Sequence, residues 1–141
     1  MIPFIETIYG AKGLYQELLS PICKKYDLTD NEIMILLYIA DEKTADTAKE
    51  IISSLKMKKS VVSMSIKDLE ERKLVHSSYS ESNRKIQHLE VDEKALEIVS
   101  EAKKIQDDYY DMITKGFSKV DKTLFKKLLS KVNKNIRGQS K

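Results

Sequence analysis

The chain has little cysteine and no long apolar run. Its one cysteine, Cys23, cannot form an internal disulfide, and no stretch approaches the roughly 20 apolar residues that a membrane-spanning helix needs. The first residues do not place basic side chains ahead of an apolar segment, so we expect no signal peptide. These absences favour a cytoplasmic protein that is not embedded in a membrane.

The recurring motifs of enzyme active sites are also missing. The sequence has no glycine-rich phosphate loop, no paired nucleophile and base, and no metalloprotease pattern. Its two histidines, His76 and His88, make a poor zinc site without well-placed carboxylates. We therefore expect no enzyme activity, no metal and no cofactor.

Charge is distributed unevenly along the 141 residues, a length that fits one domain with its own core. The net charge is only +3, yet residues 56–88 carry eight basic and four acidic side chains. Affinity for polyanions depends on local clusters of lysine and arginine more than on the total charge. The middle of the chain is therefore the candidate surface for nucleic acid.

Apolar side chains that recur every three or four residues predict six helices. Pro21 should kink or interrupt the last turn of the first helix, because proline lacks an amide N–H and clashes with the preceding turn. Thr29 and Thr47 each begin a capping-box pattern, and Asp92 can cap the long helix that follows it. The predicted helices span residues 4–26, 29–41, 47–55, 59–73, 92–115 and 118–136, and the predicted strands span residues 74–79 and 86–91.

Residues 46–91 have the element order of a winged helix-turn-helix: two helices joined by a turn, then two alternating strands. Such a unit places its second helix in the DNA major groove and its hairpin beside it. We predict a mainly α fold with a small antiparallel β wing. The single domain, residues 1–141, would contain a DNA-binding lobe at residues 27–92.

The helices at residues 1–26 and 93–141 lie outside this lobe. Their apolar stripes would be exposed in a monomer, and packing against the same helices of a second copy would cover them. A twofold dimer also presents two reading helices about one DNA turn apart, which matches a palindromic site. We therefore predict that both segments are dimerisation helices of a homodimer.

The second helix of the winged unit has basic and hydroxyl residues on its outward side. Lysines supply phosphate contacts, and serine hydroxyls can bind phosphates or base edges. Met64 can touch a thymine methyl group or pack at the edge of the lobe, and Arg84 at the hairpin tip suits a narrow minor groove. The alternative is a charged surface that only keeps the helix and hairpin soluble. The candidate DNA contacts are Lys58, Lys59, Ser60, Ser63, Met64, Lys67, Asn83, Arg84 and Lys85.

The order and spacing of these elements resemble the MarR family of bacterial regulators. Leu28-Thr29-Asp30-Asn31-Glu32 is similar to the opening of that family's second helix, and Ser60-Val61-Val62-Ser63 to the opening of its recognition helix. Leu69-Glu70-Glu71-Arg72-Lys73-Leu74-Val75 resembles the family's passage from recognition helix to wing. Asn83-Arg84-Lys85, followed by Leu89-Glu90-Val91-Asp92, stands where the family has its wing arginine and second wing strand.

This resemblance implies a dimeric transcriptional regulator that a small ligand can release from DNA. Repression is the role that the resemblance favours. Relatives bind phenolic ligands between the dimer helices and the DNA-binding lobe. Tyr9, Tyr15 and Tyr109, with Tyr110 nearby, are therefore candidate pocket residues, although tyrosines on such stripes also serve as core. Lys73 replaces the family's usual glycine, so we expect that helix end to lack a left-handed cap.

Two alternatives accompany the resemblance. Some relatives sense peroxides through a cysteine in the first helix, but Cys23 lies near the C-terminal end of its helix, where the helix dipole disfavours a thiolate. A packed thiol is therefore favoured over a redox sensor. The alternative function is a winged-helix module that binds proteins and has lost DNA binding.

Overall fold

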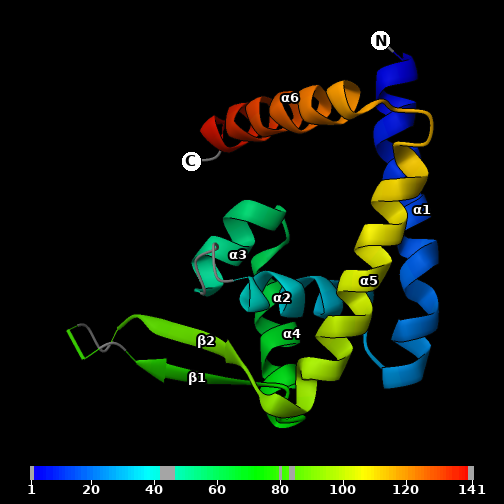
Figure 1. The fold of residues 1–141 in the computed structure, drawn as a ribbon. Helices are drawn as coiled ribbons and strands as arrows, with labels where there is room; N and C mark the ends of the chain where they lie inside the picture. Colours follow the sequence, from blue (N-terminus) through cyan, green and yellow to red (C-terminus); the bar gives the residue numbers. More distant parts are fainter. Residues whose placement is uncertain (1, 42–46, 80, 83–84, 140–141) are drawn as a thin grey trace.

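The structure is a computed structural model, and it describes residues 2–41, 47–79, 81–82 and 85–139 (Figure 1). It confirms the predicted mainly helical fold with one small antiparallel sheet. No helix among the described residues is long and apolar enough to cross a membrane. The elements are α1 (Ile2–Tyr26), α2 (Asp30–Ala40), α3 (Ala48–Leu55), α4 (Lys59–Glu71), β1 (Val75–Tyr79), β2 (Gln87–Val91), a 3₁₀ turn η1 (Glu93–Ala95), α5 (Leu96–Ile113) and α6 (Lys119–Gly138).

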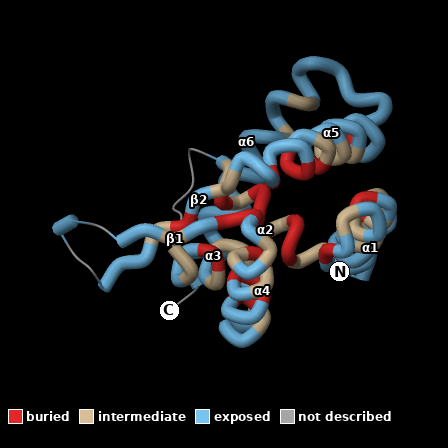
Figure 2. The backbone as a smooth tube through the Cα atoms, turned by 90° about the horizontal axis from the view of Figure 1, so that it is seen from below, coloured by how far each residue is buried: buried red, intermediate tan, exposed pale blue. Residues whose placement is uncertain are grey.

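Helix α2 forms the centre of the hydrophobic core. It contacts α1, α4, α5 and strand β2, and Figure 2 shows buried segments converging around it. Its own side chains are buried over most of the helix surface, because apolar residues occupy nearly every position between Ile33 and Ile39. The fully buried side chains that meet there include Leu19, Ile33, Ile35, Leu36, Ile51, Val62 and Leu69.

Threonine and serine caps begin three of the helices. Thr29 accepts a hydrogen bond from the Glu32 amide, and the Glu32 carboxylate accepts one from the Thr29 amide at 2.9 Å, which confirms the predicted capping box. Thr47 caps α3 by accepting from the Glu50 amide at 3.3 Å. Ser118 caps α6 by accepting from the Asp121 amide at 3.1 Å.

The prediction that Asp92 caps the long helix is wrong. A 3₁₀ turn separates Asp92 from α5, and among the described residues the Asp92 side chain makes no cap hydrogen bond. Its carboxylate instead binds Nδ1 of His76, and Nε2 of His76 lies 3.0 Å from the Glu90 carboxylate. Asp92 first and then Glu90 raise the pKa of His76. The Asp92 carboxylate therefore stabilises the base of the wing.

Of the two effects predicted for Pro21, a kink or an interruption of the first helix, the interruption is wrong. Helix α1 continues through Pro21 to Tyr26. Proline cannot donate to the carbonyl of Glu17, one turn earlier, but both residues are exposed, so water can satisfy that carbonyl.

The end of α4 has a left-handed cap even though Lys73 replaces glycine, which corrects the expectation that the cap is missing. Lys73 has φ +59°, its amide donates to the Glu70 carbonyl at 3.0 Å, and the Leu74 amide donates to the Leu69 carbonyl at 2.9 Å. This pair of bonds is a Schellman motif. Leu74 is buried and anchors the turn, which offsets the cost of about 1 kcal/mol for a left-handed lysine.

The wing is a two-stranded antiparallel sheet in which Val75 pairs with Val91 and Tyr79 with Gln87. Its base is buried through Val75 and Leu89, and its distal half is exposed. The hairpin therefore extends away from the helices, as Figure 1 shows.

Helices α1 and α5 lie side by side, whereas α6 leaves them at the Gly116 corner and crosses above α3 (Figure 1). None of the described residues of α6 is buried. Large apolar side chains are about half exposed along α6 and along the first half of α1. They include Phe4, Ile5, Ile8, Leu124, Leu128, Leu129, Val132 and Ile136.

Candidate nucleic-acid interface

Helices α3 and α4 form the helix-turn-helix, joined by residues 56–58. Lys56 adopts φ +54°, and this left-handed residue ends α3 and turns the chain into α4. Val62 and Leu69 are completely buried, and Ile66 is nearly so. These apolar contacts fix α4 against α2 and α3, so its opposite side is presented to solvent.

The predicted contact residues of α4 all lie on that exposed side. Met64 is 74% exposed, which shows that in this chain it does not pack at the lobe edge. The lysines and serines lie on the same side of the helix as Met64, so the candidate phosphate contacts and the candidate base contacts share one surface. We call this surface the α4 outer face; its residues are Lys58, Lys59, Ser60, Ser63, Met64 and Lys67, all of them exposed.

The first turn of α4 adds to the positive character of this face. Lys58 is the N-cap, with an extended backbone, and among the described residues its side chain makes no cap hydrogen bond. The first amides of the helix therefore remain available to an anion, and the helix dipole favours negative charge there. A DNA phosphate is an anion that fits this end of the helix.

The wing supplies the third part of the predicted interface. Lys85 is exposed near the end of the hairpin. Asn83 and Arg84, the other predicted wing contacts, lie outside the described residues.

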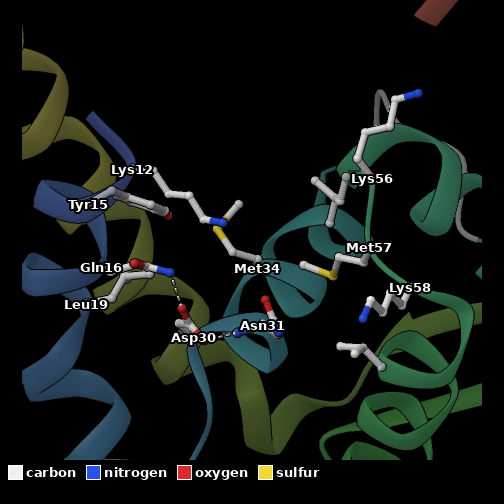
Figure 3. A pocket seen from close by; sticks show the side chains of 12 residues that line it. Lys12, Tyr15, Gln16, Leu19, Asp30, Asn31, Met34, Lys56, Met57 and Lys58 are labelled. Atoms are coloured by element: carbon white, nitrogen blue, oxygen red, sulfur yellow. Dashed lines mark hydrogen bonds between the residues drawn. The ribbon is translucent and has the colours of Figure 1, made fainter. Parts of the chain in front are cut away.

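A cleft of about 480 Å³ separates α1 from the helix-turn-helix (Figure 3). Tyr15 lines it, whereas Tyr9 and Tyr109 are not among its described lining residues. Tyr9 is 72% exposed, because six residues along a helix place it on a different side of α1 from Tyr15. Tyr109 packs behind Tyr15, with ring centroids 5.1 Å apart, and donates to the Ala11 carbonyl at 2.7 Å.

The cleft also contains residues that sequence reasoning missed. Lys12 and Leu19 stand three and four residues from Tyr15, and Gln16 stands four residues from Lys12, so one side of the helix carries all four side chains into the cleft. Gln16 donates to Asp30 at 2.9 Å across the cleft. The helical spacing around Tyr15 is the signal that would have found this part of the lining. The remaining lining residues are Asn31, Met34, Leu55, Lys56, Met57, Lys58 and Val61.

Outside this surface and the cleft, the Cys23 thiol and the acidic side chains are the next groups to consider. Burial first, and then the Asp30 charge, raise the pKa of the half-buried Cys23 thiol, which disfavours the reactive thiolate. Within the described ranges, no group of three or more histidine, cysteine, aspartate or glutamate side chains is arranged to hold a metal ion.

Comparison with known proteins relates this arrangement to one family. Residues 26–86 match the model of the MarR family. A search of the curated proteins finds no match. Among solved structures, a MarR family transcriptional regulator from Listeria monocytogenes complexed with 26mer DNA has a TM-score of 0.82 at 20% identity, over 98% of this chain and 89% of that one.

Two further structures share the fold. The transcriptional regulator SlyA has a TM-score of 0.81 at 18% identity, over 96% of this chain and 94% of that one. CouR from Rhodococcus jostii RHA1 bound to p-coumaroyl-CoA has a TM-score of 0.75 at 16% identity, over 94% of this chain and 91% of that one. The segment that carries the helix-turn-helix thus matches the MarR family model, and nearly the whole chain has the fold of these solved structures.

Proposed function

We propose that this protein is a homodimeric transcriptional repressor that binds a palindromic DNA site and is released by a small ligand. One observation carries the proposal: α4 is anchored by a buried apolar side and presents lysines and serines on the other. From Lys59 to Lys67 this surface extends about 12 Å, close to the width of the major groove. The proposed DNA contacts are the α4 outer face together with Asn83, Arg84 and Lys85 of the wing.

The exposed apolar residues of α1 and α6 support the dimer. An isolated helix of this length is marginally stable in water, and most helices are stabilised by burying an apolar side. Helix α6 buries none of its described residues within one chain, although Leu124, Leu128 and Val132 recur every four residues along it. A second copy, related by a twofold axis, would cover these side chains and would set two α4 helices on one duplex.

DNA binding is tested by salt-dependent affinity. A wild-type operator is first selected from a random duplex pool, and affinity for it is then measured by fluorescence anisotropy at several salt concentrations. Each lost phosphate contact should reduce the slope of log affinity against log salt by about 0.9. Lys59→Ala and Lys67→Ala should therefore bind more weakly and with shallower slopes, whichever duplex is offered.

The control is Lys103→Ala, which removes the same charge from an exposed position of α5. It should leave affinity and slope nearly unchanged. Full affinity in both α4 variants would refute the assigned contacts. A wild-type protein that binds no duplex even at low salt would favour the protein-interaction alternative.

The cleft beside α1 supports the ligand part of the proposal. Apolar side chains from Leu19, Met34 and Met57 line it, and Lys12 and Lys56 place positive charge at it, a combination that suits an aromatic anion. A solved relative with a TM-score of 0.68 is described as having its DNA binding regulated by 6-hydroxynicotinic acid. Each copy in the dimer contributes one DNA-binding lobe. A ligand that widens the cleft would favour a dimer in which the distance between these two lobes does not fit DNA.

The ligand is tested with a panel of aromatic carboxylates, including 6-hydroxynicotinic acid. A binder at 100 times its dissociation constant should stabilise the protein by about 2.7 kcal/mol, seen as a raised melting temperature, and should weaken DNA binding. Lys12→Glu should abolish both responses while it keeps DNA affinity, because Lys12 lies in the cleft and not on the α4 outer face. A panel that produces neither response, or an equal response in Lys12→Glu, would contradict this assignment.

A further inference from the structure

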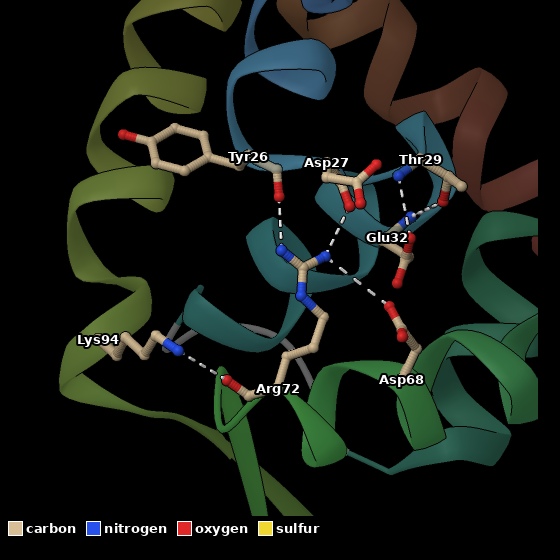
Figure 4. Close-up of polar contacts among 7 residues, drawn as sticks. All are labelled: Tyr26, Asp27, Thr29, Glu32, Asp68, Arg72 and Lys94. Atoms are coloured by element: carbon tan, nitrogen blue, oxygen red, sulfur yellow. Dashed lines mark hydrogen bonds and ion pairs between the residues drawn. The ribbon is translucent and has the colours of Figure 1, made fainter.

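Arg72 joins the end of the recognition helix to the end of the first helix. It is the C-cap residue of α4, and its guanidinium group lies against the last residues of α1 (Figure 4). One nitrogen, Nη1, donates to the carbonyl oxygen of Asp27 at 2.6 Å, and Nη2 donates to that of Tyr26 at 2.5 Å. The two partners are 45 and 46 residues away in the sequence.

The chemistry of this contact depends on arginine. The last carbonyls of a helix have no partner within the helix and carry partial negative charge. A guanidinium group offers two parallel donors in a rigid plane, whereas a lysine ammonium is a single flexible point. Asp68, one turn earlier in α4, lies 3.9 Å from Nη1 and helps to orient the group. The side chain of Arg72 is 34% exposed, so the contact is partly shielded from water.

Arg72 is also connected to the 3₁₀ turn η1, which leads into α5. Lys94, in the 3₁₀ turn that leads into α5, donates from Nζ to the carbonyl oxygen of Arg72 at 3.2 Å. The C-terminal end of α4 is thus hydrogen-bonded to the end of α1 and to the 3₁₀ turn that leads into α5, and α1 and α5 lie side by side outside the DNA-binding lobe. At its N-terminal end, by contrast, α4 borders the cleft through Lys58 and Val61. The C-terminal end of the recognition helix is therefore held by hydrogen bonds, and the cleft lies beside its N-terminal end.

We propose that Arg72 is a positioning residue that fixes α4 relative to α1 and α5 and thereby sets the half-site spacing that the dimer accepts. This inference rests on the proposed dimeric DNA binding. In a twofold dimer, the distance between the two recognition helices depends on how each is attached to its own dimerisation helices. If Arg72 makes that attachment rigid, losing it broadens the range of spacings without removing a phosphate contact.

The experiment compares operators that differ only in spacing. The operator selected with the wild-type protein is lengthened and shortened by one base pair at its centre, and dissociation constants are measured for all three duplexes. The wild-type protein should prefer the selected spacing. For each variant, the dissociation constant for an altered spacing is divided by that for the selected spacing. In Arg72→Gln and Arg72→Lys this ratio should fall about fivefold, because residues that couple two parts of a protein change such ratios by small factors. The salt slope should stay at its wild-type value.

The control variant is Lys103→Gln, which removes one positive charge from an exposed position of α5. It should leave the ratio of dissociation constants unchanged. Melting curves and sedimentation establish that each variant is folded and dimeric. Arg72→Lys keeps the charge, so it provides the test if Arg72→Gln is unstable. An unchanged ratio in a folded Arg72 variant would overturn the inference, and so would a salt slope lowered by about 0.9, which would make Arg72 a phosphate contact. If the wild-type protein binds no duplex, the proposed function itself fails.

Discussion

The Leu128→Glu variant is expected to be monomeric at micromolar concentration, whereas the wild-type protein should be a dimer. Leu128 lies in the middle of the α6 apolar stripe and is 48% exposed in a single chain. In the proposed dimer this position is covered, and burial of an unpaired carboxylate is strongly unfavourable. A twofold interface contains the substitution twice, so the dissociation constant of the dimer should rise by at least about 100-fold. Sedimentation velocity measures this directly.

The matched control is Ser130→Glu, which adds the same carboxylate to α6 two residues away. Two residues rotate the side chain to the opposite side of a helix, away from the stripe. This variant should remain dimeric. Because a monomer presents a single recognition helix, Leu128→Glu should also lose most of its affinity for the palindromic operator. A wild-type protein that is monomeric, or a fully dimeric Leu128→Glu, would refute the assigned interface.

The second large effect is expected for Leu69→Ala, which should destabilise the fold by about 3 kcal/mol. Leu69 is completely buried on the inner side of α4, and its carbonyl accepts the Leu74 amide in the cap of that helix. Truncation leaves a cavity between α4 and the core. Urea denaturation at a fixed protein concentration measures the change, since the stability of a dimer depends on concentration.

The comparison for this prediction is Met64→Ala on the α4 outer face. Met64 is exposed, so its truncation should change the free energy of unfolding by less than about 0.5 kcal/mol. It should instead alter DNA affinity if the residue meets a thymine methyl group. Equal destabilisation by the two substitutions would mean that the inner and outer sides of α4 have been assigned wrongly.

Much of the fold can be predicted because its signals are local. The repeat of apolar residues places every helix, and the Thr29 and Ser118 caps are formed by residues only three positions apart. The exposed side of α4 follows from the same repeat, because fixing Val62 and Leu69 inside turns Ser63, Met64 and Lys67 outward.

The errors at Asp92 and in the cleft lining have a different cause, since these features depend on residues far apart in the sequence. Asp92 was expected to cap a helix, but it binds His76, 16 residues earlier, across the wing. The lining of the cleft depends on which side of α1 faces α2. No sequence pattern near Tyr9 or Tyr109 shows that these two tyrosines lie outside the cleft while Tyr15 lines it. No sequence pattern predicts the Arg72 contact, because its partners are main-chain carbonyl oxygens 45 and 46 residues away.

The use of main-chain acceptors at the end of α1 affects how this joint can change during evolution. Every amino acid carries the same carbonyl group, so a change of side chain at position 26 or 27 keeps the acceptors of Arg72, although Asp27, with φ +54°, stands where glycine, asparagine or aspartate is favoured. Selection on the side chains of this joint would therefore act on Arg72 and on Asp68 beside it, with no compensating side-chain partner at the end of α1. Covariation between aligned positions would miss such a contact, and coordinates are the means of finding it.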